Sequence, residues 1–417
     1  MSTATPRAGT TGTTADAEVT HALAATSAAA VAADTDTPVV HTVTLVGPRG
    51  FGATYRARIA ALTAQGRVRL GAVVSPDDPA GLDDLPDGTP WFRTLEENLA
   101  SEDPAIRPDV VIVSTPIHTH LPITEVALRA GCDVMLEKPP VPSAADQARL
   151  LRLVEETGRL CQVGFQTFGS TAVAEVERVV TSGEIGEVVS VGTVGTWTRP
   201  ASYWARAPWA GRRVLDGVEV VDGVVTNPLA HAVATALRVG GVRRAEDVAE
   251  VEVDLFHANP IEADDTSSVR VLATSGVTFG FGLSLCAPVR TPSRITVYGT
   301  LGRVVLYYET DRVEVQLPEG VRFVQGGRMP LLDDLLDVRE RRAERELLCS
   351  LDATGAFTQV VEAVRSAPAP RRVPEDLVRW VGEGGDRRPV VKEVEEWCER
   401  VAARSQTFAA AGAPWAV

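Results

Sequence analysis

The sequence contains few cysteines and no paired cysteine motif. Its 417 residues include five cysteines, and no two of them form a Cys-x-x-Cys pair. Such pairs are the usual ligands of structural zinc, and even, regularly spaced cysteines are typical of secreted proteins with disulfides. The pattern therefore offers no zinc site and indicates free thiols in a reducing compartment. We expect a cytoplasmic protein without a bound metal.

Positive charge and long apolar runs are scarce as well. Lysine and arginine together number 41 against 55 acidic residues, which gives a formal net charge of −14. Because nucleic acids and anionic membrane surfaces bind basic patches, neither is expected as a partner. The sequence has no run of 18 apolar residues and therefore predicts no transmembrane helix.

The first 37 residues lack the elements of a secretory signal. Residues 1–37 are rich in alanine and threonine and hold a single arginine. A secretory signal would need a basic start followed by a stretch rich in Leu and Val. We expect a disordered tail here, followed by two domains.

Residues 38–166 alternate short apolar runs with amphipathic segments. The expected strands are 41–47, 68–75, 109–115, 133–138 and 160–165, and the expected helices are 51–66, a segment ending at 130, and 143–157. Continuous apolar strands separated by helices are typical of a parallel sheet covered on both faces. The sequence thus predicts an α/β protein whose N-terminal domain, residues 38–166, is a doubly wound parallel sheet.

Residues 167–417 instead alternate apolar and polar residues within their strands. The expected strands are 186–197, 248–258, 267–275, 277–286, 293–300 and 303–309. They predict an α+β domain for substrate binding and oligomerisation, with a large open-faced, mostly antiparallel sheet. Because helices of one domain would cover only one face, we expect the other, apolar face to pair with a second copy in a homodimer or homotetramer.

The first expected strand runs into a glycine-rich turn, Gly-Pro-Arg-Gly-Phe-Gly, at residues 47–52. Glycines between a strand and a helix let the backbone approach a pyrophosphate at the positive end of the helix. Gly47, Gly50 and Gly52 are present, whereas Arg49 replaces the second glycine of the usual G-x-G-x-x-G. The turn predicts a dinucleotide site; the alternative is a tight turn that merely needs glycine.

The second expected strand ends at Ser75, which is followed by Asp77 and Asp78 and by no adjacent basic residue. An acid at this place holds the ribose hydroxyls of NAD, and an arginine favours the 2′-phosphate of NADP. Because two acids repel an additional phosphate, the sequence favours NAD over NADP.

Leu-Glu-Lys-Pro-Pro, residues 136–140, closes the strand expected at 133–138. Lys138 would face the crevice in which ligands bind in open α/β sheets, where its ammonium can bond a substrate hydroxyl. The alternative is a surface lysine at a turn fixed by proline.

Three blocks, STPIHTH, ALRAGCDVMLEKP and ETGRLCQVGFQ, resemble the glucose-fructose oxidoreductase / inositol dehydrogenase / rhizopine catabolism (Gfo/Idh/MocA) family. The similarity covers residues 41–310. The resemblance implies that residues 38–166 form a dinucleotide-binding Rossmann domain, followed by an α+β domain with an open-faced sheet. It implies an enzyme that uses NAD(P) to oxidise or reduce a sugar or cyclitol, with Lys138 in the active site. It also implies a second motif, Asp-x-x-x-His, whose histidine accepts a proton; Asn227 and His231 match its spacing.

Asn227 stands where the family has aspartate. It can orient the imidazole of His231 but cannot stabilise the charged form, and it can equally be only the cap of the helix expected to begin with Pro228. A carboxylate of the preceding loop, from Asp216, Glu219 or Asp222, would supply the missing charge. Without one, we expect the pKa of His231 at or below about 6.5, and an Asn227→Asp variant should raise it with little change in stability.

The loop at 199–213 is dense in aromatic residues and arginine. Tyr203 and Trp209 would lie against a sugar while Arg206 bonds a hydroxyl or carboxylate, unless the loop only packs on its own rings. His118 and His120 lack a third ligand, so contact with cofactor or substrate is favoured over a metal. The expected cofactor contacts are Gly47, Arg49, Gly50, Phe51, Gly52, Ser75, Thr115, Pro116, His120, Glu137 and Lys138.

Together these features predict an oxidoreductase acting on a secondary alcohol of a sugar, sugar derivative or cyclitol. The catalytic candidates are Lys138, His231 and Asn227, and the substrate-binding candidates are Lys138, Tyr203, Arg206, Trp209 and His231. His231 would take the hydroxyl proton while a hydride moves to the nicotinamide. The alternatives are an NAD-dependent glycosidase with transient internal redox and a non-catalytic, sugar-sensing relative.

Overall fold

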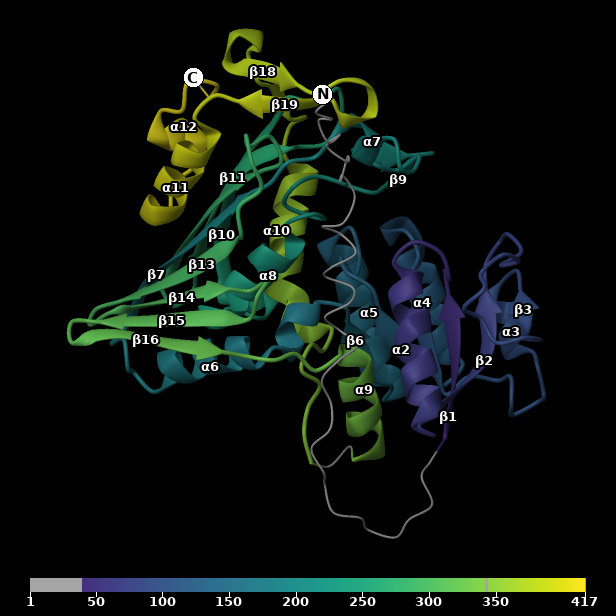
Figure 1. The fold of residues 1–417 in the computed structure, drawn as a ribbon. Coiled ribbons are helices and arrows are strands. Elements are labelled where there is room, and N and C mark those ends of the chain that lie inside the picture. Colours follow the sequence, from purple (N-terminus) through teal and green to yellow (C-terminus); the bar gives the residue numbers. More distant parts are fainter. Residues whose placement is uncertain (1–39, 342–343, 417) are drawn as a thin grey trace, which may run out of the picture.

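The computed structural model describes residues 40–341 and 344–416, so the tail expected at 1–37 lies outside the described residues. Two sheets dominate the fold, a six-stranded and a nine-stranded one. Figure 1 shows them side by side with helices between them. The predicted fold class, a parallel α/β sheet followed by a mostly antiparallel sheet, is confirmed.

The first sheet is parallel, with strand order β3-β2-β1-β4-β5-β6. Its strands are β1 (His41–Val46), β2 (Val68–Val74), β3 (Trp91–Phe92), β4 (Val110–Val113), β5 (Asp133–Leu136) and β6 (Cys161–Val163), and its helices are α2 (Gly52–Ala64), α3 (Leu95–Leu99), α4 (His120–Arg129) and α5 (Ala144–Thr157). The central strands are buried along their whole length because helices cover both faces. Their carboxyl ends therefore share one edge, where ligands bind in folds of this kind.

The second sheet is mixed, with strand order β16-β15-β14-β13-β7-β12-β11-β10-β17. Its strands are β7 (Val188–Thr196), β10 (Val248–His257), β11 (Thr266–Ala273), β12 (Thr278–Ser284), β13 (Arg294–Gly299), β14 (Arg303–Tyr307), β15 (Arg312–Leu317), β16 (Gly320–Gln325) and β17 (Arg371–Arg372). Most neighbours are antiparallel, whereas β7 runs parallel to β12 and β10 runs parallel to β17.

Helices cover both faces of this second sheet over its central strands. The helices α6 (Thr171–Thr181), α8 (Ala230–Val239) and α10 (Gly355–Ser366) lie on the face toward the first sheet, and α11 (Val394–Arg404) with α12 (Phe408–Ala411) lies on the other face (Figure 1). Short elements complete the chain: α7 (Ala201–Trp204), β8 (Val214–Leu215), β9 (Val218–Glu219), β18 (Val378–Val381) and β19 (Arg388–Val391).

The expectation of an uncovered, apolar face on β11 and β12 is wrong. Phe279 and Phe281 point inward and are fully buried, while Gly280 and Gly282 face outward beneath α11. A Cβ on Gly280 would lie 2.7 Å from the carbonyl oxygen of Ala402, so only glycine allows the helix to pack this closely. The outer face at these strands is therefore occupied by the chain's own C-terminal segment.

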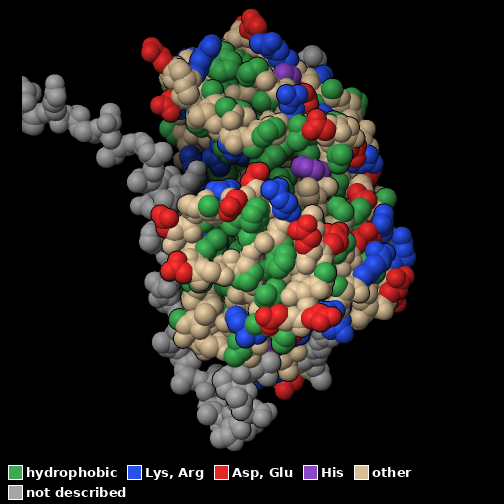
Figure 2. Space-filling view, turned by 90° about the vertical axis from the view of Figure 1, so that its right-hand side faces the viewer, with side chains coloured by type: hydrophobic (Ala, Val, Ile, Leu, Met, Phe, Trp, Pro, Cys, Tyr) green, Lys and Arg blue, Asp and Glu red, His purple; other side chains and the backbone are tan. Residues whose placement is uncertain are grey.

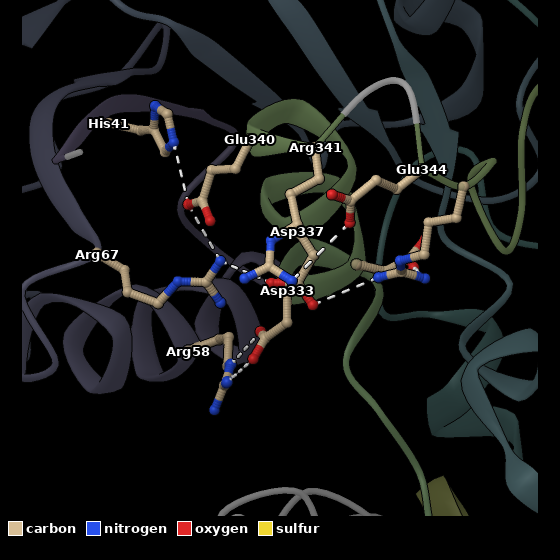
Figure 3. Close-up of polar contacts among 10 residues, drawn as sticks. His41, Arg58, Arg67, Asp333, Asp337, Glu340, Arg341 and Glu344 are labelled. Atoms are coloured by element: carbon tan, nitrogen blue, oxygen red, sulfur yellow. Dashed lines mark hydrogen bonds and ion pairs between the residues drawn. The ribbon is translucent and has the colours of Figure 1, made fainter. Parts of the chain in front are cut away.

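The helix α9 (Leu331–Glu340) follows the second sheet in sequence but packs against the first. Figure 3 shows its acidic side chains facing basic groups of the first domain. Arg58 bonds Asp333 at 2.7 Å through Nε, and Arg67 bonds Asp337 at 2.7 Å. These ion pairs connect α9 to the first domain.

No helix within the described ranges is both long and apolar enough to cross a membrane.

Candidate active site

The glycine turn after β1 forms one wall of the site. Gly47 has φ +83°, and a Cβ there would lie 2.5 Å from the Ser114 carbonyl oxygen, so the close approach of the two loops requires glycine. Gly52 begins α2, and a Cβ on it would collide with the Gly47 carbonyl. The Ser114 hydroxyl beside the turn is buried and has no partner among the described residues. A turn of this shape, with a free hydroxyl at a helix start, fits a bound pyrophosphate.

A cavity of about 640 Å³, here called the Lys138 cavity, opens at the carboxyl edge of the first sheet. It brings together many of the residues predicted from the sequence: Arg49, Gly50, Phe51, Thr115, Pro116, Glu137, Lys138, Arg206, Trp209 and Asn227. Both parts of the molecule contribute to it. Arg206, Trp209 and Asn227 come from the segment between β7 and α8, whereas the other residues follow strands of the first sheet. The cavity is large enough for a ring-sized substrate beside a cofactor ring.

A chain of three polar side chains crosses the Lys138 cavity. The Lys138 ammonium donates to the Asn227 Oδ1 at 2.7 Å, and the Asn227 Nδ2 donates to the Asp222 Oδ1 at 2.6 Å. Burial lowers the pKa of Lys138, while the charges of Glu137 and Asp222 act in the opposite direction. The Asn227 amide thus connects Asp222 to Lys138. Because its nitrogen donates to Asp222, its oxygen is oriented toward the ammonium.

The Glu137 carboxyl lies behind Lys138 and is itself buried. Burial raises its pKa, and the Tyr55 hydroxyl donates to its Oε1 at 2.6 Å. The residue lines the cavity without a direct ion pair to the neighbouring ammonium in the described chain.

Asn227 is not the helix cap, so that alternative is wrong. Helix α8 begins at Ala230 with Leu229 as its N-terminal cap residue, and no side chain bonds the cap. Residues 224–229 form turns before the helix starts, which leaves the Asn227 amide free to bond Lys138 and Asp222. Neither role left open by the sequence appears in the geometry, since Asn227 does not cap α8 and forms no hydrogen bond with His231 in the described residues. It bonds Lys138 and Asp222 instead.

Asp222 is held in place by a strained turn. Val221 has φ +44°, which costs a β-branched residue roughly 1–3 kcal/mol and is found mostly at functional sites. The Thr226 hydroxyl bonds the Val221 carbonyl, and the Gly211 N–H donates to the Asp222 Oδ2 at 2.8 Å. Of the three loop carboxylates considered, Asp222 is the one that reaches Asn227, and it does not bond His231.

The loop at 199–213 packs partly on itself and partly on the cavity. The Arg206 guanidinium lies 3.7 Å from the centre of the Tyr203 ring and 4.6 Å from that of Trp209, and it pairs with Asp222 at 3.2 Å. Arg206 and Trp209 line the cavity, whereas Tyr203 supports Arg206 from behind. Tyr203 is therefore not placed where it could contact a substrate in this cavity, whereas Arg206 and Trp209 are.

His231 is the second residue of α8 and is half-buried. Its ring meets Phe165 edge-on at 5.6 Å, and its buried Nδ1 has no hydrogen-bond partner in the described part of the chain. Burial, together with the charges of Lys138 and Arg328, holds its pKa well below the usual 6.5. The direction agrees with the sequence prediction, but the dominant cause is burial. His231 is not among the residues lining the Lys138 cavity.

A second cavity, about 440 Å³ and here called the Ser75 cavity, lies on the other side of the glycine turn. Gly47, Arg49, Ser75, Thr115 and Pro116 line it as predicted. Arg93 and Glu96 line it too, and the sequence analysis missed both. Arg93 directly follows the short strand β3, and Glu96 lies in α3. No local sequence motif marks either residue.

His120 holds the loops together without lining either cavity. Its Nε2 lies 2.8 Å from the Thr115 carbonyl oxygen and its Nδ1 lies 2.9 Å from that of Pro139. It therefore positions the ends of β4 and β5 relative to each other. In residues 40–341 and 344–416, no three His, Cys, Asp or Glu side chains gather as a metal site.

Sequence models of one protein family match both parts of the chain. The model described as oxidoreductase family, NAD-binding Rossmann fold, matches residues 15–165. The model described as the GFO/IDH/MocA C-terminal domain matches residues 173–305.

Similar proteins are known as dehydrogenases and reductases. The chain is 35% identical over 148 residues to dTDP-3,4-didehydro-2,6-dideoxy-α-D-glucose 3-reductase of Streptomyces violaceoruber, covering 35% of this chain and 42% of that protein. It is 29% identical over 151 residues to inositol 2-dehydrogenase of Corynebacterium glutamicum, covering 35% of this chain and 43% of that protein. The matches thus span less than half of either relative.

A solved structure extends the likeness to both sheets. The WlbA dehydrogenase from Bordetella pertussis, in complex with NADH and UDP-GlcNAcA, superposes with a TM-score of 0.64 at 20% identity. The superposition covers 79% of this chain and 97% of that one. At this identity the likeness concerns the fold.

Proposed function

Because the chain belongs to the Gfo/Idh/MocA family of oxidoreductases, we propose that it is an NAD(P)-dependent dehydrogenase acting on a secondary alcohol of a sugar, sugar derivative or cyclitol. The observation that carries the proposal is the Lys138 cavity, in which a half-buried ammonium shares the lining with residues of the glycine turn of the cofactor domain. The named activities of the relatives point to the same substrates.

The residues around the cavity suit this chemistry. The nicotinamide, when bound, supplies the hydride acceptor or donor. Lys138 binds the reacting oxygen and stabilises its developing negative charge, and Asn227 keeps the ammonium oriented. His231 is the proposed acceptor of the hydroxyl proton in the oxidation direction, because its low pKa keeps the imidazole neutral at pH 7. Its ring does not line the Lys138 cavity in this structure, so substrate binding must bring the two together.

The proposal also covers the substrate contacts, the oligomeric state and the cellular compartment of the protein. Trp209 and Arg206 bind the substrate, and homodimers or homotetramers form in a cytoplasm that keeps the five buried cysteines reduced. Nucleic acid and membrane surfaces are not proposed as partners. On the face shown in Figure 2, acidic and basic side chains are interspersed rather than gathered into a basic patch.

A lysine variant tests the mechanism. We expect Lys138→Ala to lower kcat/KM by a factor of about 100 or more, because one preorganised donor at a developing charge contributes about 3–4 kcal/mol. The substrate would first be found by incubating the protein with sugars, polyols and cyclitols and with NAD or NADP, and following reduced nicotinamide by absorbance. The same variant should still bind the dinucleotide in a fluorescence titration.

Lys392 provides the matched control, since it is the other lysine of the sequence and its side chain is 67% exposed. Lys392→Ala should leave both turnover and binding unchanged. Wild-type turnover in Lys138→Ala would remove this lysine from the mechanism.

A further inference from the structure

The Ser75 cavity carries an excess of positive charge that the proposed reaction does not use. It is formed by the ends of β1, β2 and β4, on the opposite side of the glycine turn from Lys138. Among its lining residues, Arg49 and Arg93 are basic and Glu96 is acidic. If a dinucleotide spans the turn with its reactive ring at Lys138, its adenosine half lies in this cavity.

The two arginines converge on the segment that follows β2. Arg49 donates to the Asp78 carbonyl oxygen at 3.0 Å, and Arg93 donates to that of Pro76 at 3.0 Å. Neither guanidinium forms an ion pair with a carboxylate in the described ranges. Both therefore keep N–H donors free beside Ser75, the last residue before that segment.

The acids that follow Ser75 do not balance this charge. Asp77 and Asp78 are exposed, and neither lines the cavity. Arg49 and Arg93 are exposed as well, but they line the cavity, so they act on an anion inside it at shorter range than the two acids do. The Ser75 side chain, by contrast, belongs to a residue only 8% exposed and carries a hydroxyl instead of the carboxylate that holds a free ribose.

From these contacts we infer that Arg49, Arg93 and Ser75 bind the 2′-phosphate of NADP(H), so that the protein prefers NADP(H) to NAD(H). Guanidinium groups match a phosphate with paired, charge-assisted hydrogen bonds. Arg49, which replaces the second glycine of the turn, then serves to bind the 2′-phosphate. This inference rests on the proposed function, because it assumes that the cofactor domain binds a dinucleotide.

Binding without turnover tests the inference. Full-length protein would be titrated with NADPH and with NADH, following nicotinamide fluorescence, and with 2′,5′-ADP and 5′-ADP by calorimetry. We expect NADPH to bind at least tenfold more tightly than NADH and 2′,5′-ADP more tightly than 5′-ADP. Arg49→Ala and Arg93→Ala should each weaken NADPH binding about tenfold to a hundredfold, the range for a charge-assisted bond, and change NADH binding less than threefold.

Arg69→Ala is the matched control. Arg69 is a part-exposed arginine that also bonds a backbone carbonyl, that of Pro104 at 3.2 Å, but it does not line the Ser75 cavity. It should bind both dinucleotides like the wild type. NADH binding as tight as or tighter than NADPH binding would overturn the inference while the proposed function stands, as would equal losses for both cofactors in the arginine variants. If neither dinucleotide binds, the proposed function fails with it.

Discussion

At the scale of single residues, Asn227 lies between the Asp222 carboxylate and the Lys138 ammonium, and no carboxylate bonds His231 among the described residues. The Asn227 amide donates to the Asp222 carboxylate at 2.6 Å and accepts from the Lys138 ammonium at 2.7 Å, so it connects the two charged groups. An amide can donate to one partner and accept from another, which a carboxylate cannot do. Asn227 therefore suits a position between a carboxylate and an ammonium.

This geometry changes what an Asn227→Asp variant should do. A carboxylate at 227 would keep one oxygen on the Lys138 ammonium, but its other oxygen would face the Asp222 Oδ1 at hydrogen-bonding distance, where the amide now donates. We expect this repulsion to outweigh the ammonium and to raise the pKa of the carboxylate pair above the usual value of about 3.9. A raised pKa in the folded state contributes stability that is present at acidic pH and is lost as the pH rises through that pKa. The expectation from sequence, that stability would hardly change, is therefore replaced.

We expect Asn227→Asp to be less stable than the wild type by about 1–2 kcal/mol at pH 8, with a smaller deficit at pH 5. Urea unfolding of both proteins at the two pH values measures this. The double variant Asp222→Asn, Asn227→Asp restores one amide and one carboxylate and should recover most of the loss. Equal stability of the single variant and the wild type at both pH values would show that the two side chains do not interact.

At the scale of helices and strands, the first domain is predictable and the covering helices are not. The strands of the first sheet are continuous apolar runs, a pattern that needs no knowledge of their neighbours. By contrast, Gly192, Gly280 and Gly282 are ordinary strand residues in sequence, and only the packing of α11 more than 100 positions later explains them. A separation of 89 positions likewise hides the contact between Lys138 and Asn227, although each residue is predicted separately.

Helix α9 illustrates this most clearly, because Arg58 and Arg67, which bond its acidic side chains, precede those partners by 270–275 positions. Asp333, Asp337 and Glu340 lie on the side of α9 that faces Arg58 and Arg67 (Figure 3). The Arg58 and Asp333 side chains are 19% and 15% exposed, so this pair is less screened than a surface pair. It should contribute measurably to the docking of α9.

A double-mutant cycle with Arg58→Ala and Asp333→Ala should give a coupling free energy of about 1 kcal/mol or more in the free energy of unfolding. The cycle Arg341→Ala with Glu344→Ala is the control. Those side chains are 65% and 68% exposed and 4.0 Å apart, so their coupling should be near zero. The same small value in both cycles would mean that α9 is held by its apolar residues alone.

At the scale of the whole molecule, the C-terminal segment decides which surface is left for a second copy. Helices α11 and α12 form a second apolar core on the outer face, with Phe256, Cys398, Phe408 and Trp415 buried in it. A partner therefore has no access to the sheet at β11 and β12. The outer face at β14–β16 lacks such a cover among the described residues.

The two edge strands of the nine-stranded sheet, β17 and β16, differ in length and in the charge of their side chains. Strand β17 has two residues, both exposed arginines, and charged short edges resist pairing. Strand β16 has six residues, and its Val321 and Phe323 are 52% and 62% exposed on the outer face. An edge strand with unpaired backbone groups and exposed apolar side chains can pair with its own copy about a two-fold axis.

We therefore expect a homodimer that forms through β16, and Phe323→Glu should convert it into a monomer because paired strands would bring two like charges together. Light scattering at micromolar concentration measures the mass of wild type and variant. Val289→Glu is the control, since Val289 is 60% exposed in the loop after β12 and lies off this edge, so this variant should stay dimeric. A monomeric wild type would refute the association itself, whereas a dimer that survives Phe323→Glu would move the interface away from β16.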